Sequence, residues 1–394
     1  MNTDVKYFDN FMVGAPHLRE TPGALLDVLD GCLVNGFGEV TVTSLSVVSG
    51  IGTVVVAGGH GLEMYFRVDV GPVIEVSGAN ETLVNGQFRV TSVVDIETFT
   101  FAATEVPDVT ASGDIKVKRA PAGWSSLDIG DKVRAYRQGG GSRFFLRVDD
   151  NHNEHAQVRG YEEMPDGSTV FRPFPELSVQ PADELTWARA TSPSLRAWSL
   201  FASDRFLLYL SEWDDERLGA YEPFLFGDPI HYAANDPYGC IISGKEYSKY
   251  WYIGRENPVL TYSLSEERTW WARAFIDQLS PVPVDNLTHH YGVSRDDVYG
   301  HTGGNYFDYP NPVDNSIIVR GPIEVGEYGN RLVRGHYPGI YYPYHHWNNM
   351  PGVRFGLQGT AQGKQRAFAG FLICGHNHSS VDGAILIDYV NWYS

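Results

Sequence analysis

The chain has 394 residues, a formal net charge of −18 at pH 7 and a hydrophobic fraction of 43%. This length predicts two or three domains, and the hydrophobic fraction excludes disorder over most of the chain. Because acidic chains repel nucleic-acid phosphates and no run of 18 apolar residues occurs, we expect neither a nucleic-acid partner nor a membrane span.

The cysteines and the first residues indicate where the chain is made. Cys32, Cys240 and Cys374 are far apart and form no CxxC pair, so neither a disulfide framework nor a zinc ribbon is indicated. The opening residues lack the basic segment and apolar stretch of a signal peptide. We therefore expect synthesis in a reducing cytoplasm.

The N-terminal residues 1–38 are predicted to hold an assembly arm followed by one short helix. The first 20 residues show no periodicity, yet they include the apolar Tyr7, Phe8, Phe11 and Met12, which suit a free, solvated tail poorly. We expect this arm to become ordered only against a partner.

The helix is predicted over residues 22–34. Thr21-Pro22 offers an N-cap and a proline at the first helical position, and Asn35-Gly36 supplies a stop. Between these signals, apolar residues recur at helical spacing, namely Leu25, Leu26, Leu29, Cys32 and Leu33.

From residue 39 to 119 the pattern changes to the period of two that is typical of strands, with a turn about every ten residues. Asn85-Gly86 separates two apolar segments and predicts a two-residue hairpin in which both turn residues have positive φ. We expect a small β-sandwich or barrel domain here.

Two further regions are predicted. Residues 120–226 form a second β domain that includes a buried hairpin, residues 197–213, around Ser203-Asp204. Residues 227–394 form a loop-rich β C-terminal domain. The 42 glycines and 22 prolines, without a period of three, agree with many turns between short strands. The expected fold class is mainly β and multi-domain, with one short N-terminal helix.

Gly375-His376-Asn377-His378 with Asp382 is the one sequence pattern that suggests a metal. His376 and His378 share a face if the segment is extended, and Cys374 would share it as well. The alternative, a polar turn before a buried strand, is favoured, since Gly375 weakens the case for an extended segment. We therefore predict no metal, no cofactor and no catalytic residue.

Other polar clusters are interpreted as structural. Asp149-Asp150 and Asp214-Asp215-Glu216 could serve glycoside hydrolysis only as a facing pair in a groove, so solvated loops are favoured. Gly139-Gly140-Gly141 lacks the Lys-Ser/Thr of a phosphate loop and predicts a hairpin turn. Several histidines and tyrosines favour an interface over a catalytic site: His289-His290, His301, His336, Tyr341, Tyr342, Tyr344 and His345-His346.

Several segments carry a resemblance to a known family. Tyr7-Phe-Asp-Asn, Val13-Gly-Ala-Pro and residues 21–38 resemble the opening of a family of tailed-bacteriophage virion proteins. Further segments resemble a β module of phage tail and baseplate proteins or later parts of the same family: Gly59-His-Gly, Val76-Ser-Gly-Ala, Asn85-Gly-Gln-Phe-Arg-Val, Thr98-Phe-Thr-Phe, Lys118-Arg-Ala-Pro-Ala-Gly-Trp, Leu146-Arg-Val-Asp-Asp, Val158-Arg-Gly-Tyr-Glu and Tyr309-Pro-Asn-Pro-Val-Asp-Asn-Ser. The likeness is densest before residue 165.

This resemblance implies a non-enzymatic structural component of the virion, in the tail, baseplate or fibre-attachment region. Its partners would be other virion proteins and further copies of itself. Two alternatives stay open at this point. One is a tail protein that binds or degrades a host surface glycan, and the other is a neck or capsid-decoration protein.

Overall fold

The structure is a computed structural model that describes residues 2–64, 70–152, 154–165, 169–176, 185–190, 194–212, 221–231, 236–246, 269–275, 278–286, 313, 316–327, 333–343, 354–361, 364–374, 381–390 and 392. Within these residues, regular structure is almost entirely β-strand, with one short α-helix. The predicted fold class, mainly β with several sheets and a short N-terminal helix, is confirmed.

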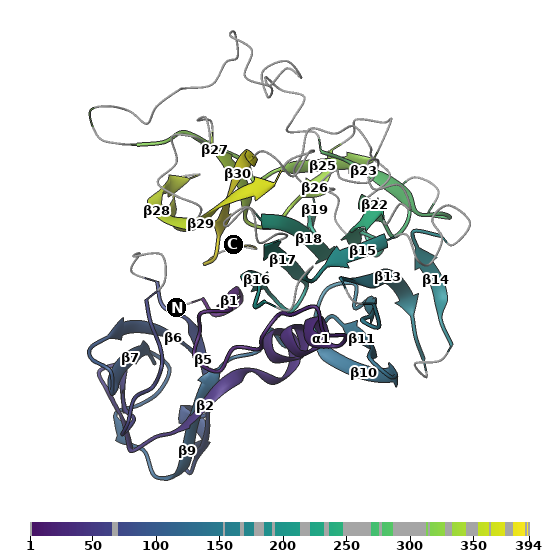
Figure 1. Cartoon of the computed structure of the whole chain (residues 1–394). Coiled ribbons are helices and arrows are strands. Elements are labelled where there is room, and N and C mark those ends of the chain that lie inside the picture. Colours follow the sequence, from purple (N-terminus) through teal and green to yellow (C-terminus); the bar gives the residue numbers. More distant parts are fainter. Residues whose placement is uncertain are drawn as a thin grey trace.

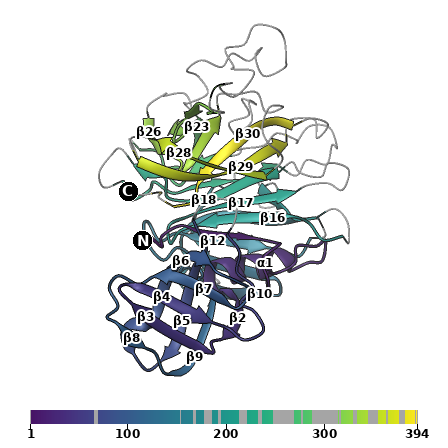
Figure 2. The ribbon, with the colours of Figure 1, turned by 90° about the vertical axis from the view of Figure 1, so that its left-hand side faces the viewer.

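An eight-stranded antiparallel sheet forms the lobe at the bottom of Figures 1 and 2, in the order β2-β9-β5-β6-β7-β4-β3-β8. Only residues 42 and 43 separate β2, at one end of this order, from β3, near the other, so the sheet curls into a half-barrel, called the barrel below. Its strands are β2 (Phe37–Thr41), β3 (Ser44–Val48), β4 (Ile51–Val55), β5 (Val73–Ala79), β6 (Gly86–Val93), β7 (Thr98–Ala102), β8 (Val109–Thr110) and β9 (Gly113–Arg119).

The period-two pattern of this segment fills the barrel. Leu45 and Val47 on β3, Val54 on β4, and Phe99 and Phe101 on β7 are all buried in one cluster. Their neighbours along each strand point outward, as the alternation of a strand requires. The barrel therefore has a hydrophobic core of its own.

The connection from β5 to β6 differs from the predicted two-residue turn. A 3-10 turn, η3 (Thr82–Val84), lies within it, and Asn85 has φ −79° instead of a positive value. The Asn85 side chain donates to the Ala79 carbonyl (2.7 Å) and accepts from the Ala79 N–H (2.9 Å). These two bonds close a wider loop, so the prediction of positive φ at Asn85 was wrong. Gly86 does have a positive φ.

The predicted helix is present but begins two residues later. Helix α1 (Ala24–Leu29) continues into a π-helical turn, η1 (Asp30–Asn35), and Gly23 rather than Thr21 is the N-cap. All five residues predicted to form the apolar face are buried. The backbone N–H of Leu25 donates to the Asp150 carboxylate at 2.9 Å, so the cap comes from a distant residue.

A seven-stranded antiparallel sheet follows the barrel in sequence. Its order is β10-β11-β12-β13-β15-β21, and β14 pairs with β13 beside this path. The strands are β10 (Ser125–Gly130), β11 (Val133–Arg137), β12 (Phe145–Asp149), β13 (His155–Glu163), β14 (Phe171–Phe174), β15 (Leu185–Ala188) and β21 (Lys245–Glu246).

Fifteen of the described strands form the third sheet, in which β18 and β29 make a parallel contact among antiparallel pairs. Figure 2 shows β16, β17 and β18 between β10 and β12 below and β28, β29 and β30 above. The strands are β1 (Lys6–Asp9), β16 (Trp198–Ala202), β17 (Phe206–Glu212), β18 (Tyr221–Gly227), β19 (Ile230–His231), β20 (Ile241–Ser243), β22 (Thr269–Trp271), β23 (Val282–Asn286), β24 (Val319–Arg320), β25 (Glu324–Glu327), β26 (Val333–His336), β27 (Ile340–Pro343), β28 (Arg354–Ala361), β29 (Lys364–Cys374) and β30 (Val381–Asp388).

The hairpin predicted at residues 197–213 is confirmed. Strands β16 and β17 pair in antiparallel register, Trp198 opposite Ser211, and every residue of both strands is buried. Such continuous burial is expected for strands that are covered on both faces. One large core extends from this hairpin to the helix on one side and to Ile385 and Ile387 on the other, so it crosses the predicted boundary at residue 226.

The N-terminal arm is ordered within its own chain. Strand β1 pairs with β16, with Tyr7 opposite Phe201, and Tyr7, Phe8 and Met12 are buried in the large core. The expectation that this arm needs a partner to become ordered was therefore wrong, because its apolar side chains find their cover inside the fold. Phe11 is the exception, with 70% of its surface exposed.

Candidate functional site

A pocket of about 420 Å³ lies where two sheets meet. One wall comes from β13 and β14 of the seven-stranded sheet, and the other comes from the connection between β22 and β23 of the large sheet. These strands lie at the right of Figure 1. The volume falls within the range of about 300–1,000 Å³ that is usual for sites that bind small molecules.

A buried ion pair forms the floor of the pocket. Glu162 on β13 accepts two hydrogen bonds of 2.5 Å from Arg273, one from Nε and one from an Nη. The other Nη of Arg273 donates to the Gln278 carbonyl (2.9 Å), and the guanidinium stacks 3.8 Å from the centre of the Tyr238 ring. Each planar group is therefore held in one orientation, which predicts a rigid floor.

The rim of the pocket carries unusual backbone geometry. Arg172 has φ 53° and Gln278 has φ 53°, and they are two of five non-glycine residues with positive φ in the described part of the chain. This region costs an L-residue roughly 1–3 kcal/mol, and such residues concentrate at functional sites. The Arg172 side chain is 60% exposed and approaches Glu162 at 3.5 Å.

A second buried network, centred on Arg334, contacts the end of β22 and Arg273. Arg334 on β26 donates to Asp236 (2.7 Å) and to Glu327 (3.0 Å), and its guanidinium lies 4.1 Å from the centre of the Trp271 ring. The same guanidinium donates to the Arg273 carbonyl at 2.6 Å. The end of β22 is thus fixed by charged hydrogen bonds and by the stacked guanidinium of Arg334.

The remaining lining is apolar. Pro173 lies on β14, Pro281 precedes β23, and Leu279 is 79% exposed at the edge. Glu162, Glu176, Arg172 and Arg273 give the lining two carboxylates and two guanidinium groups. Its formal charges balance, so the pocket offers hydrogen-bond donors and acceptors together with an apolar wall.

Sequence reasoning missed this pocket. The one local signal is Trp271-Ala272-Arg273, where alternation places the arginine on the same side of the strand as a buried tryptophan. A cation on a buried face requires a partner. That partner, Glu162, is 111 residues away, and the sequence does not identify it.

The candidate metal residues are not brought together by described structure. His376 and His378 lie outside the described residues, and Asp382 lies on β30 without a described side chain. Within the described part of the chain, no group of three or more His, Cys, Asp or Glu residues has the spacing to hold a metal. In the same part, no helix has the length and hydropathy to cross a membrane.

The structure corrects the interpretation of Asp149-Asp150 as a solvated loop. Asp150 is fully buried and forms a 2.5 Å ion pair with the equally buried Arg189. Burial raises the pKa of Asp150 to about 6, although Arg189 and backbone N–H groups act in the opposite direction. Asp150 thus caps helix α1 and forms an ion pair with Arg189 in the core. The Asp214-Asp215-Glu216 cluster lies outside the described residues.

Most of the predicted histidine and tyrosine cluster is also outside the described residues, including His289, His290, His301, His345 and His346. Tyr341 is buried on β27, and His336 on β26 is partly buried. Burial lowers the pKa of His336 below its ordinary value. Tyr342, also on β27, is partly buried against the large core, so the expected polar-aromatic patch is described at these three positions only.

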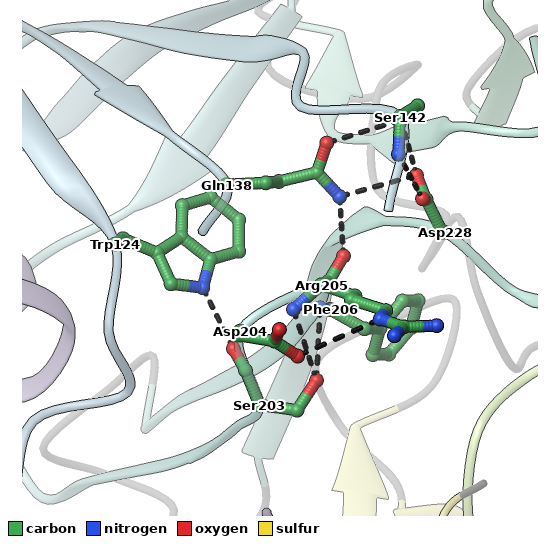
Figure 3. Close-up of polar contacts among 8 residues, drawn as sticks. All are labelled: Trp124, Gln138, Ser142, Ser203, Asp204, Arg205, Phe206 and Asp228. Atoms are coloured by element: carbon green, nitrogen blue, oxygen red, sulfur yellow. Dashed lines mark hydrogen bonds and ion pairs between the residues drawn. The ribbon is translucent and has the colours of Figure 1, made fainter. Parts of the chain in front are cut away.

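The triple glycine forms the predicted connection, between β11 and β12. Figure 3 shows how this connection contacts the large sheet: Ser142 donates to Asp228 through its N–H (2.6 Å) and its hydroxyl (2.5 Å). Gln138 donates to the same carboxylate (3.1 Å), and Trp124 donates to the Ser203 carbonyl (2.7 Å). These bonds join the β11–β12 connection to the large sheet.

The four predicted assembly residues, Tyr7, Phe8, Phe11 and Met12, differ in how exposed they are. The Tyr7 hydroxyl donates to Asp9 (2.5 Å), which also accepts from Arg354 on β28 (2.7 Å). Burial raises the pKa of Tyr7 well above its ordinary value. Phe11 packs its ring 5.2 Å from the Arg354 guanidinium but stays largely open to solvent. Of the four, Phe11 alone is available to a partner.

Comparisons with known proteins give little guidance. No protein-family model matches the chain, and no curated protein matches it. Among solved structures, the phage phi92 endosialidase is similar at 14% sequence identity and a TM-score of 0.17, over 90% of this chain and 71% of that chain. A TM-score this low supports no inference about shared fold or function.

Proposed function

We propose that the chain is a structural component of a tailed-phage particle, in the tail, baseplate or fibre-attachment region, and that it acts through protein–protein assembly. The resemblance to virion proteins of residues 21–38 and of the other short segments named above supports this proposal. The mainly β fold with several packed sheets agrees with it.

The observation that carries the proposal is an exposed apolar surface formed by Phe11, Val13, Val94 and Ile96. Their exposed fractions are 70%, 62%, 61% and 79%. Large apolar side chains that gather on a surface mark interaction sites, whereas single ones are ordinary. We call these four residues the N-terminal apolar surface.

Contacts through Gly59-His60-Gly61 show that the two halves of this surface are neighbours. A Cβ on Gly61 would lie 2.8 Å from the Cβ of Val13, and the His60 N–H donates to the Ile96 carbonyl at 3.1 Å. The arm and the β6–β7 turn of the barrel thus meet at one place. Because the chain carries a net charge of −18, a partner with a basic rim suits this surface better than an acidic one.

Incorporation into particles tests the proposal. We expect Phe11→Ser combined with Ile96→Ser to reduce the amount of the chain in purified particles severalfold, since the partner would lose its apolar contacts. Val48→Ser combined with Ile51→Ser is the matched control, because these residues are similarly exposed (60% and 54%) on the β3–β4 turn. Equal incorporation of both variants and the wild type would contradict the assigned surface.

The proposal assigns no reaction to the chain. Hydrolysis assays with purified protein on bacterial surface polysaccharides test this part separately. Release of reducing ends that scales with protein concentration and survives repurification would contradict it.

A further inference from the structure

We propose that the pocket between β13–β14 and the β22–β23 connection binds a pyranose sugar through adjacent hydroxyl groups. This binding activity goes beyond assembly and does not depend on it. The pocket combines planar charged groups, an apolar wall and backbone strain at its rim.

The polar groups match the chemistry of a sugar. A hydroxyl group both donates and accepts, and neighbouring hydroxyls on a ring can engage both atoms of one carboxylate or guanidinium. Glu162 and Glu176 supply acceptors, and Arg172 supplies donors from a side chain that is 60% exposed. Since the two carboxylates and two guanidinium groups balance, a simple anion or cation gains no net attraction.

The floor needs no rearrangement to receive a ligand. Arg273 is fixed by Glu162 on two atoms, by the Gln278 carbonyl and by the Tyr238 ring. Glu162 therefore keeps one orientation, with lone pairs beyond those that Arg273 occupies. A rigid polar site avoids the entropy that flexible side chains lose on binding.

The apolar wall of the pocket matches the C–H face of a sugar ring. Pro173, Pro281 and Leu279 offer aliphatic surface, and the C–H face of a pyranose packs against such surface when its hydroxyls point to the floor. Leu279 is 79% exposed at the edge of the pocket, so its side chain is accessible to a ligand.

Backbone strain points to the same place. Positive φ at Arg172 and Gln278 costs stability, and a pure packing role would be served equally by glycine. The Arg172 side chain lines the pocket and approaches Glu162 at 3.5 Å. We therefore expect Arg172→Gly to keep or raise the melting temperature while it removes a ligand contact.

Saturation-transfer NMR on the full chain tests the proposal, with methyl glycosides of glucose, galactose, mannose, rhamnose and N-acetylglucosamine as probes. We expect transfer to at least one sugar in the wild type and an affinity about tenfold lower in Arg172→Gly. Arg143→Gly is the matched control, because Arg143 also has positive φ (61°) but does not line the pocket, so it should bind as the wild type does.

Three results would overturn the proposal. The first is no transfer to any of the five sugars. The second is transfer that Arg172→Gly and Arg143→Gly leave equally strong, which would place binding elsewhere. The third is binding of acetate or sulfate by a protein that binds none of the sugars, which would make the pocket a simple anion site. Competition between a binding sugar and its deoxy analogue supports the proposal if the analogue binds more weakly.

Discussion

Asp150 and Arg189 form an ion pair of 2.5 Å in which both side chains are fully buried. The same carboxylate accepts the Leu25 N–H at the start of α1 (2.9 Å). Arg189 donates in turn to the carbonyl of Glu20 (2.7 Å). One charged pair thus ties the N-terminal helix and the segment before it to the ends of β12 and β15.

Asp150→Ala should lower the free energy of unfolding by about 3–5 kcal/mol, because it leaves the buried Arg189 charge without its partner and removes the helix cap. Urea denaturation measures the change. Asp149→Ala is the control, since the pair of Asp149 with Arg147 (3.0 Å) is partly exposed and worth at most about 1 kcal/mol. Equal losses in the two variants would contradict the role assigned to Asp150.

The pKa of Asp150 predicts a pH dependence of stability. Burial raises this pKa to about 6 in the folded chain, whereas an unfolded aspartate has a pKa of about 3.9. The folded state therefore binds the proton more tightly, and the contribution of this group to stability falls as pH rises from about 4 to about 6. Unfolding free energies of wild type and Asp150→Asn at several pH values measure it. A difference that stays constant from pH 4 to 7 would contradict the prediction.

Asn85 tests whether the β5–β6 loop depends on hydrogen bonds or on positive φ. Its side chain makes two bonds to Ala79 at φ −79°. Asn85→Gly and Asn85→Ala should therefore destabilise the chain by a similar amount, about 1–2 kcal/mol, as thermal unfolding would show. Asn85→Asp keeps the acceptor but sets a carboxylate oxygen against the Ala79 carbonyl, so it should lose at least as much. A glycine variant as stable as the wild type would instead support a turn held by positive φ.

Comparing alanine substitutions at Gly141 and Gly123 separates two reasons for a glycine: lack of space for a Cβ atom and a positive φ. Both have positive φ, but a Cβ on Gly141 would lie 2.0 Å from the Asp228 carboxylate, whereas a Cβ on Gly123 would meet nothing within 4 Å. Gly123→Ala should cost roughly 1 kcal/mol, and Gly141→Ala should cost more than about 3 kcal/mol because it displaces Asp228 from Ser142. Chemical denaturation of both variants compares them; equal costs would show that the network in Figure 3 adapts easily.

Local patterns predicted the local elements. The spacing of Leu25, Leu29 and Leu33 marks the buried face of the helix, and the apolar segments on either side of Ser203-Asp204 form the buried hairpin. These features depend on neighbours within a few residues, so periodicity is enough to find them.

Distant pairs were not predictable in this way. The residues around Asp150 predict a polar turn, because its partners Leu25 and Arg189 are distant in the sequence. Glu162 and Arg273 form the pocket floor from positions 111 residues apart. The prediction that the N-terminal arm needs a partner was wrong for the same reason, since β16, the strand that covers the arm, lies about 190 residues further along the chain.

Mass spectrometry of purified particles tests the central proposal most directly. Virus-like particles should be isolated from a lysate of cells that carry the gene for this chain in its genomic context and washed at high salt, and the chain should be quantified against the most abundant particle protein. We predict that the chain stays with the particle at a fixed number of copies. Its absence from washed particles, with abundant chain left in the soluble lysate, would contradict the assignment to the virion.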